Sequence, residues 1–408
     1  MKHVYASIDI GSDSVKVVVT ELYRDHLNLL AATSVPSKGI KKGLIVEPNL
    51  AKESIIRALK EVEAMLGVRI RKVLATVPSH FADYKVIKGN CTVEGDLITS
   101  KDMINSYKDG IKKNIAPNEE FVTVVPIDFK INGKTVMKDP KNFPGQTLVG
   151  RAMMITTPKK NVYSVASIIE SIGVELADIT VGSIGDVAVF KNKEVEETLG
   201  AIINIGADMT MVSLYNKGVP ASTKIIGQGG KDIDKDLSYM YRISTTDARK
   251  IKETFAHAHT RNASKDSFYK VKNIEGKEIK ISDYDASKIA MSRLKEILSL
   301  SKKALEDLTN NKIQYIIVTG GTSNMLDIEH VIDSELLSGK KGNVKLIGIR
   351  NNKYATAIGS IIYFLNTLKL KGMDYSMMSR EDMDDLSSPK SDNDETVLGK
   401  VFSYFFGE

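Results

Sequence analysis

Apolar positions in this chain form short stretches that end at glycine turns, and two of these stretches repeat each other. Residues 8–17 and 203–212 share two isoleucines, a glycine, an aspartate and a valine at equal offsets. Each stretch predicts an apolar strand, a tight glycine turn and a second strand. One such unit is a weak signal, but two copies 195 residues apart predict two similar half-molecules that face each other.

Further patterns predict elements close to these turns. Residues 313–318 read as an apolar strand, and the next six residues, 319–324, contain a pair of glycines. Residues 227–233 contain another glycine pair and precede a predicted helix, whose first amides attract anions. Ser244 and Asp247 form a capping box, so we expect the next helix to begin there.

The glycine turns carry the candidate chemistry. Backbone amides and small hydroxyls in the two repeated turns can hold the two sides of a polyphosphate. Paired glycines let the backbone approach a ring or a ribose closely, where a Cβ atom would collide. Each pattern taken singly is equally consistent with ordinary loop structure, but their order and spacing together predict a ligand site in the cleft between the halves.

Length and composition limit the class of protein. A chain of 408 residues with 42% hydrophobic residues can bury a substantial core and is too long for one typical domain. The single cysteine, Cys91, excludes an internal disulfide and a cysteine zinc cluster, which fits a reducing cytosol. The amino terminus predicts a core strand rather than a signal peptide. The apolar stretch at 355–365 is too short and too interrupted to span a bilayer.

The net charge of +6 is distributed unevenly. Residues 373–395 contain eight acidic and two basic residues, so the rest of the chain carries +12. These basic residues are dispersed and lack interleaved aromatic side chains, so we expect solvated faces and no nucleic-acid groove. His257 and His259 suggest a metal site at first sight. On a helix, however, side chains two positions apart are separated by a rotation of about 200° around the axis, so they point to opposite sides. No acidic or cysteine residue accompanies them at ligand spacing, so we expect no metal pair.

The end of the chain has its own pattern. Residues 373–394 are rich in serine and aspartate and nearly lack large aliphatic residues, which predicts an acidic disordered linker. Residues 395–408 follow as a short amphipathic helix with no core of its own to join. We expect its apolar side to lie in a membrane leaflet, with docking on the protein body as the alternative. The predicted membrane residues are Val397, Leu398, Val401, Phe402, Phe405 and Phe406.

Together these motifs resemble the phosphate, adenosine and connecting motifs of actin-like ATPases, and the agreement is closest with the bacterial cell-division family FtsA. The motifs are residues 8–16, 203–210, 229–230, 319–321 and 354–359. The resemblance covers nearly the whole chain, because the region after the first motif is also similar to the extra subdomain, called 1C, of FtsA. It implies that the cleft binds ATP with Mg²⁺.

The resemblance also implies the roles of individual residues. Asp9 and Asn204 would lie at the metal ion, and the two glycine turns would hold the phosphates from opposite lobes. The later glycines would surround the ribose and adenine. The implied nucleotide-binding residues are Gly11, Ser12, Asp13, Ser14, Lys16, Gly206, Ala207, Asp208, Thr210, Gly229, Gly230, Arg249, Lys252, Gly320, Gly321, Ser323 and Asn324.

Two positions depart from the family pattern. The second phosphate turn has Asn204 where the family usually has aspartate, so one carboxylate near the cation is replaced by a neutral amide. Mg²⁺ prefers oxygen ligands arranged by carboxylates, so this change predicts weak or absent ATP hydrolysis. The family's Ala-Glu pair reads here as Ala248 and Arg249, which replaces a ribose-binding acceptor with a cation.

The predicted helix at 286–308 has two interpretations. Apolar residues recur at helical spacing with basic residues around them, which is typical of a core helix with a solvated face. The resemblance implies instead that this subdomain receives the carboxyl-terminal tail of the tubulin-like protein FtsZ. Arg293 is then the candidate to pair with that acidic peptide.

The expected architecture is an actin-like, duplicated two-lobed α/β fold with an inserted small α+β subdomain, a disordered linker and a carboxyl-terminal amphipathic helix. Each lobe should contain a five-stranded type of sheet. The expected divisions are 1–77, 158–194 and 360–372 for subdomain 1A; 78–157 for 1C; 195–245 and 313–359 for 2A; 246–312 for 2B; 373–394 for the linker; and 395–408 for the membrane helix.

The function implied by the resemblance is a division scaffold. Such a protein would self-assemble into protofilaments and attach FtsZ filaments to membrane lipids, at the cytoplasmic face of the cell membrane and at the division site, with other divisome proteins as further partners. The rivals on the same fold are a pilus-assembly adaptor of the PilM type and a sugar or acetate kinase. A kinase needs a catalytic carboxylate and a sugar pocket that the sequence does not locate, and a pilus adaptor has no use for the terminal apolar helix.

Overall fold

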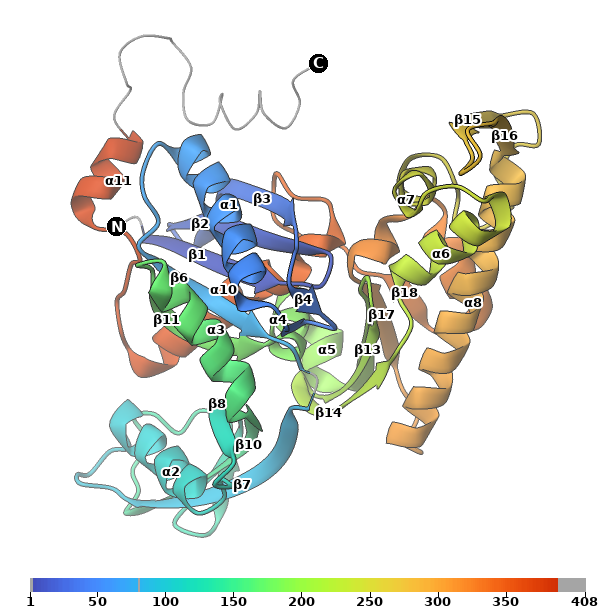
Figure 1. The fold of residues 1–408 in the computed structure, drawn as a ribbon. Helices are drawn as coiled ribbons and strands as arrows, with labels where there is room; N and C mark the ends of the chain where they lie inside the picture. Colours follow the sequence, from blue (N-terminus) through green and yellow to red (C-terminus); the bar gives the residue numbers. More distant parts are fainter. Residues whose placement is uncertain (1–2, 80, 388–408) are drawn as a thin grey trace.

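The protein is described by a computed structural model that covers residues 3–79 and 81–387 (Figure 1). Two five-stranded sheets form two lobes, and a four-stranded sheet forms an insert that projects from the first lobe. A two-stranded sheet lies in a small subdomain of the second lobe. The predicted two-lobed α/β class is thus confirmed.

The sheet of the first lobe has the strand order β11-β6-β1-β2-β3. Successive side chains of β1 point to opposite faces, so Val4, Ala6 and Ile8 pack under helices α1 and α3, whereas Tyr5 packs against α10. The elements of this lobe are β1 (His3–Ile10), β2 (Ser14–Tyr23), β3 (His26–Pro36), β4 (Ile40–Lys41), β5 (Leu44–Ile45), α1 (Pro48–Leu66), β6 (Lys72–Val77), α3 (Lys159–Ser171), β11 (Glu175–Val181), α4 (Gly182–Val189) and α10 (Ala355–Lys371).

The sheet of the second lobe has the order β14-β13-β12-β17-β18, which repeats the mixed topology of the first lobe. One buried core joins the lobes, because Tyr5 and Val18 of the first sheet and Ile202 and Ile317 of the second belong to one cluster that also contains residues of α4 and α10. The elements of this lobe are α5 (Lys193–Glu197), β12 (Leu199–Ile205), β13 (Thr210–Asn216), β14 (Val219–Ile226), β17 (Tyr315–Thr319), η1 (Gly321–Asn324), α9 (Ile328–Glu335), β18 (Gly339–Lys341) and η2 (Asn352–Tyr354).

The small subdomain of the second lobe begins at the glycine pair 229–230. Ser244 caps a helix, as predicted, by accepting a hydrogen bond of 3.0 Å from the backbone amide of Asp247. The long helix α8 begins in the same way, with Ser282 accepting from the amide of Asp285. The elements are α6 (Gly230–Tyr241), α7 (Thr245–Thr254), β15 (Phe268–Lys272), β16 (Glu278–Ser282) and α8 (Asp283–Leu308).

The insert has a core of its own. Helix α2 lies so close to the sheet that a Cβ atom on Gly89 would meet the carbonyl oxygen of Ser106 at 1.8 Å, and the rings of Tyr107 and Phe129 are 5.2 Å apart. A unit with a separate core can differ between related proteins without disturbing the cleft. Its elements are β7 (Asp83–Thr92), α2 (Ser100–Lys112), β8 (Glu119–Ile131), β9 (Thr135–Met137) and β10 (Thr147–Pro158).

The structure corrects the start of the predicted linker. The chain after α10 returns to the start of β1, where the amide of Met377 donates a 2.9 Å hydrogen bond to the carbonyl oxygen of Val4. Met377 and Met378 are buried there, and helix α11 (Arg380–Ser387) follows. Methionine and tyrosine supply the packing that a count of aliphatic residues missed. The predicted membrane helix at 395–408 and the rest of the linker lie outside the described residues.

Candidate functional site

A cavity of about 650 Å³ lies between the lobes, and most of the predicted site residues line it. The two repeated strand-turn-strand units meet there from opposite sides, β1 and β2 from the first lobe and β12 and β13 from the second. The predicted residues that line the cavity are Asp9, Gly11, Ser12, Asp13, Ser14, Lys16, Asn204, Gly206, Ala207, Asp208, Gly230, Arg249, Lys252, Gly320, Gly321 and Asn324.

Three predicted residues are not part of this lining. Thr210 is fully buried, and its hydroxyl donates to the carbonyl oxygen of Gln228. Ser323 is fully buried and bonds to the carbonyl of Gly320, so it supports the turn from behind. Gly229 lies against the second turn, where a Cβ atom would meet the carbonyl oxygen of Ala207 at 2.5 Å.

The turn of the first lobe, residues 11–14, joins β1 to β2. The amide of Gly11 donates to the carbonyl oxygen of Ser14 at 3.1 Å, which closes the turn. A Cβ atom on Gly11 would lie 2.8 Å from the ammonium nitrogen of Lys16. Lys16 forms a 2.9 Å ion pair with Asp9, whose other oxygen accepts from Thr76 at 3.1 Å. A cation and a carboxylate therefore face the same cavity, side by side.

The turn of the second lobe has the same construction. The amide of Gly206 donates to the carbonyl oxygen of Met209 at 3.0 Å. The start of α6 is fixed to this turn, because the amides of Gly230 and Lys231 donate to the carbonyls of Gly206 and Ala207 at 2.8 and 2.9 Å. The amino terminus of α6, with its partial positive charge, thus lies beside the second turn.

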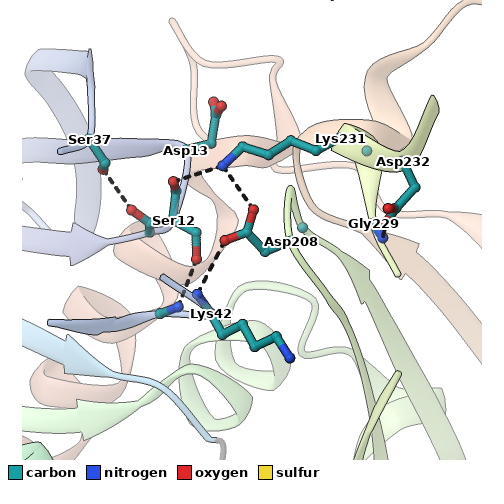
Figure 2. Close-up of polar contacts among 12 residues, drawn as sticks. Ser12, Asp13, Ser37, Lys42, Asp208, Gly229, Lys231 and Asp232 are labelled. Atoms are coloured by element: carbon teal, nitrogen blue, oxygen red, sulfur yellow. Dashed lines mark hydrogen bonds and ion pairs between the residues drawn. The ribbon is translucent and has the colours of Figure 1, made fainter. Parts of the chain in front are cut away.

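Polar contacts cross the cleft between the two turns (Figure 2). Lys231 forms a 2.8 Å ion pair with Asp208 and donates to the carbonyl oxygen of Ser12 in the other lobe at 3.2 Å. Asp208 also accepts from the backbone amide of Lys42, again in the other lobe. Burial opposes ionisation of Asp208, but these hydrogen bonds prevail and hold its pKa below the usual value. Sequence reasoning left Lys231 out of the site.

Arg249 makes the second contact between the lobes. It reaches from α7 to the first turn, and its guanidinium group donates two hydrogen bonds, of 2.7 and 2.9 Å, to the carboxylate of Asp13. The Nε–H group of Arg249 donates to the carboxylate of Glu253 at 2.8 Å. Burial disfavours the charged guanidinium, yet these two carboxylates raise its pKa. Arg249, which stands where the resemblance implies a glutamate, is therefore bound to Asp13 of the first lobe.

The third wall of the cavity requires glycine. Gly320 has a φ of 91°, and a Cβ atom there would lie 2.4 Å from the side-chain oxygen of Asn204 and 2.5 Å from the carbonyl of Ile205. Lys252, also in the cavity lining, forms a 2.7 Å ion pair with Asp234 and donates to the carbonyl of Gly230. Burial raises the pKa of Asp234, which Lys252 partly offsets.

Asp186 is a functional candidate that sequence reasoning missed. It is fully buried in α4 and accepts hydrogen bonds from Asn204 at 2.8 Å and from Thr356 at 2.7 Å. Burial raises its pKa to about 6. The signal in the sequence was a lone aspartate inside the apolar run 184–190.

The residues present fit a nucleotide and a hydrated cation. The turns place backbone amides and Lys16 at the cavity wall, and glycines leave space where a Cβ atom would intrude. Asp9, Thr76 and Asn204 bring oxygen atoms to the same cavity. Mg²⁺ commonly keeps several waters and takes only one or two protein ligands beside the phosphates, so this small set of oxygens is sufficient.

The expected helical placement of His257 is corrected. Helix α7 ends at Thr254, and the segment that follows bridges to Leu326. The ring of His257 lies between two carboxylates, 2.8 Å from Asp327 and 3.5 Å from Asp283. No glycine or proline marks the end of α7, so the sequence pattern extended this helix too far. The result is a polar contact that joins the small subdomain to α9.

Arg293 lies on α8 with three of the five N–H donors of its guanidinium group in hydrogen bonds. Its guanidinium group forms two hydrogen bonds to Asp236 of α6, at 2.7 and 2.9 Å, and a third to Glu296 at 2.7 Å. The hydrogen bond with Asp236 raises the pKa of Arg293. An acidic peptide would have to share this guanidinium group with the two carboxylates or displace one of them.

The fold and the cleft define an actin-like two-lobed protein. By structure, the chain is similar to a protein of the "PilM-PilN type IV pilus biogenesis complex", with 15% identity and a TM-score of 0.59 over 88% of this chain and 98% of that one. It is also similar to MreB5 of Spiroplasma citri bound to ADP, with 15% identity and a TM-score of 0.54 over 90% and 98% of the two chains. At this identity the likeness establishes the fold.

Sequence comparison identifies the relatives within that class. The family model "Cell division protein FtsA" matches residues 201–359. Cell division protein FtsA of Bacillus subtilis is 28% identical over 374 residues, which cover 90% of this chain and 85% of the relative. The predicted resemblance to the FtsA family is confirmed. Among the helices that the structure describes, none is long and apolar enough to cross a membrane.

Proposed function

We propose that this chain binds ATP with Mg²⁺ in the interlobe cleft, with weak or absent hydrolysis, and works as a division scaffold. The observation that carries the proposal is the pair of glycine turns, residues 11–14 and 206–208, which face each other across one cavity. Their opposed backbone amides suit the two sides of a polyphosphate. A solved structural neighbour holds ADP, which supports a nucleotide as the ligand.

Nucleotide binding is tested with a fluorescent ATP analogue. Lys16→Ala removes the cation beside the first turn, and we expect it to weaken binding at least tenfold, because charge-assisted bonds to phosphate are the strong ones. Lys101→Ala is the matched control, since Lys101 forms an exposed pair with Glu94 in the insert. Equal affinities for both variants and the wild type would contradict this use of the cleft.

We further propose that the protein self-assembles and tethers FtsZ filaments to the cytoplasmic face of the membrane at the division site, among other divisome proteins. The relationship to FtsA supports this role, and the apolar residues predicted at 397–406 supply the tether. The insert, residues 78–157, is the proposed longitudinal contact. It has its own core, and of its described residues only Pro78 and Ser79 line the cavity.

The insert is tested by deletion. A chain without residues 78–157 should still bind the ATP analogue but should no longer pellet as polymer with ATP and lipid. Retained nucleotide binding shows that the lobes are folded. Polymer formation by the shortened protein would reject the insert as the contact.

The FtsZ contact is tested at α8. A peptide with the acidic FtsZ tail should bind Arg293→Ala at least tenfold more weakly than the wild type. The control is Arg242→Ala, because Arg242 lies in the same subdomain and pairs with Glu275 on an exposed surface. Equal binding to both variants would leave Arg293 as a structural residue that holds α6 and α8 together.

A further inference from the structure

Asp186 lies where the two lobes share one core. Helices α4 and α10 cross at their backbones there, because a Cβ atom on Gly359 would lie only 1.7 Å from the carbonyl oxygen of Gly185. The close crossing brings Asp186 within 2.7 Å of the hydroxyl of Thr356 at the start of α10. Asp186 itself is 0% exposed. A carboxylate at this depth requires an explanation, because burying a charge is costly.

Both hydrogen-bond partners of Asp186 belong to the cleft wall. The amide nitrogen of Asn204 donates to one carboxylate oxygen and the hydroxyl of Thr356 donates to the other. Asn204 and Thr356 line the cavity, whereas Asp186 lies behind them. An ionised carboxylate only accepts hydrogen bonds, so it fixes which end of the Asn204 amide faces it. The side-chain oxygen of Asn204 is thereby left toward the Gly320 turn of the cavity.

We propose that Asp186 is a positioning residue of the cation site, which orients the amide oxygen of Asn204 and supplies from behind it the negative charge that the family pattern carries at 204. This inference rests on the proposed binding of ATP with Mg²⁺. The carboxylate that the resemblance implies at 204, in β12, is thus provided by the adjacent side chain in α4. Outer partners of this kind commonly set metal affinity by fixing the inner ligand.

The charge has no packing role that a neutral residue could not fill. An asparagine at 186 has the same shape, could accept from Asn204, and could donate to the hydroxyl of Thr356. Asp186 does feel the groups of the cation site, since the charge of Asp9 raises its pKa and the charge of Lys16 lowers it, both less strongly than burial and the two hydrogen bonds act. These three charges and the amide of Asn204 form one electrostatic unit.

The contact between Asp186 and Asn204 determines what the substitution Asn204→Asp should do. Asn204→Asp alone would bring two carboxylates into contact in place of the present 2.8 Å hydrogen bond, and both could not ionise there at once. The single substitution should therefore fail to improve the site. The exchange Asp186→Asn with Asn204→Asp keeps one carboxylate and one amide in contact and moves the charge to the position of the family pattern.

The test measures how much Mg²⁺ is needed to strengthen binding of a fluorescent ATP analogue, with thermal unfolding of each variant as the folding check. Asp186→Asn should raise the half-saturating Mg²⁺ concentration about tenfold or more, with affinity in EDTA unchanged. The exchange variant should return it to the wild-type value or below. Asn204→Asp alone should not lower it.

The outcomes separate this inference from the proposed function. Failure of the wild type to bind nucleotide with or without Mg²⁺ would overturn both. Normal nucleotide binding with an unchanged Mg²⁺ requirement in Asp186→Asn would overturn only the role of Asp186. If Asp186→Asn does not fold, the exchange variant decides the question. A folded exchange variant whose Mg²⁺ requirement stays tenfold above the wild type would overturn the inference.

Discussion

Arg249 and Asp13 join the two lobes at the cleft, with the guanidinium of one bonded twice to the carboxylate of the other, at 2.7 and 2.9 Å. Both residues line the cavity that we assign to the nucleotide. The resemblance implies a glutamate at 249, which could not form this cross-lobe pair. A bound polyphosphate would bring further negative charge next to Asp13.

The first prediction is that Asp13→Asn tightens binding of ATP. The substitution removes a like charge from the phosphate side of the cavity and frees Arg249, and one such contact corresponds to about 1 kcal/mol, or roughly a fivefold gain in affinity. Glu275→Gln is the matched control, because it breaks the exposed pair with Arg242 away from the cleft. Titration calorimetry measures both. Weaker or unchanged binding by Asp13→Asn would contradict the prediction.

The second prediction concerns the glycine wall. Gly320→Ala would place a methyl group against Asn204 and the carbonyl of Ile205, so we expect ATP binding to fall at least tenfold. Gly276→Ala controls for backbone strain, because Gly276 has a similar positive φ of 79° and nothing within 4 Å of its Cβ position. Only the first variant should lose binding. Similar losses in both would show that backbone strain, rather than the clash with Asn204 and Ile205, is responsible.

The third prediction is that Asp186→Asn stabilises the nucleotide-free protein at neutral pH. Folding raises the pKa of Asp186 from 3.8 to about 6, so the native state favours the protonated form. The corresponding stability is full below pH 3.8 and is lost as the pH rises through about 6. Asparagine avoids that loss, which amounts to at most about 3 kcal/mol.

Thermal unfolding as a function of pH checks this prediction. At pH 7.5 Asp186→Asn should unfold at a higher temperature than the wild type, and the difference should disappear near pH 4. Such a result, together with a higher Mg²⁺ requirement of the variant, would show that Asp186 lowers the stability of the protein and improves its Mg²⁺ binding. A variant that is less stable than the wild type at pH 7.5 would give Asp186 a structural role instead.

Local patterns predicted much of the fold and most of the cleft. The two strand-turn-strand units were visible because apolar alternation and a glycine turn are properties of neighbouring residues. Asp186 was missed because it meets Asn204 only when α4 packs against the strand β12. Met377 was assigned to a linker because its hydrogen-bond partner, Val4, lies at the other end of the chain. Contacts between residues so far apart in the sequence produce no pattern among neighbouring residues.

The central claim is that this protein joins a nucleotide-dependent polymer to a membrane, and flotation with vesicles of phosphatidylglycerol and phosphatidylethanolamine tests it most directly. Many terminal helices acting together in a polymer should bind far more tightly than one. With ATP and Mg²⁺ the wild type should float with the vesicles, and Phe402→Glu should remain at the bottom. Ser403→Glu, which adds the same charge to the polar side of the predicted helix, should float like the wild type. Flotation of Phe402→Glu to the same extent as the wild type would contradict the account.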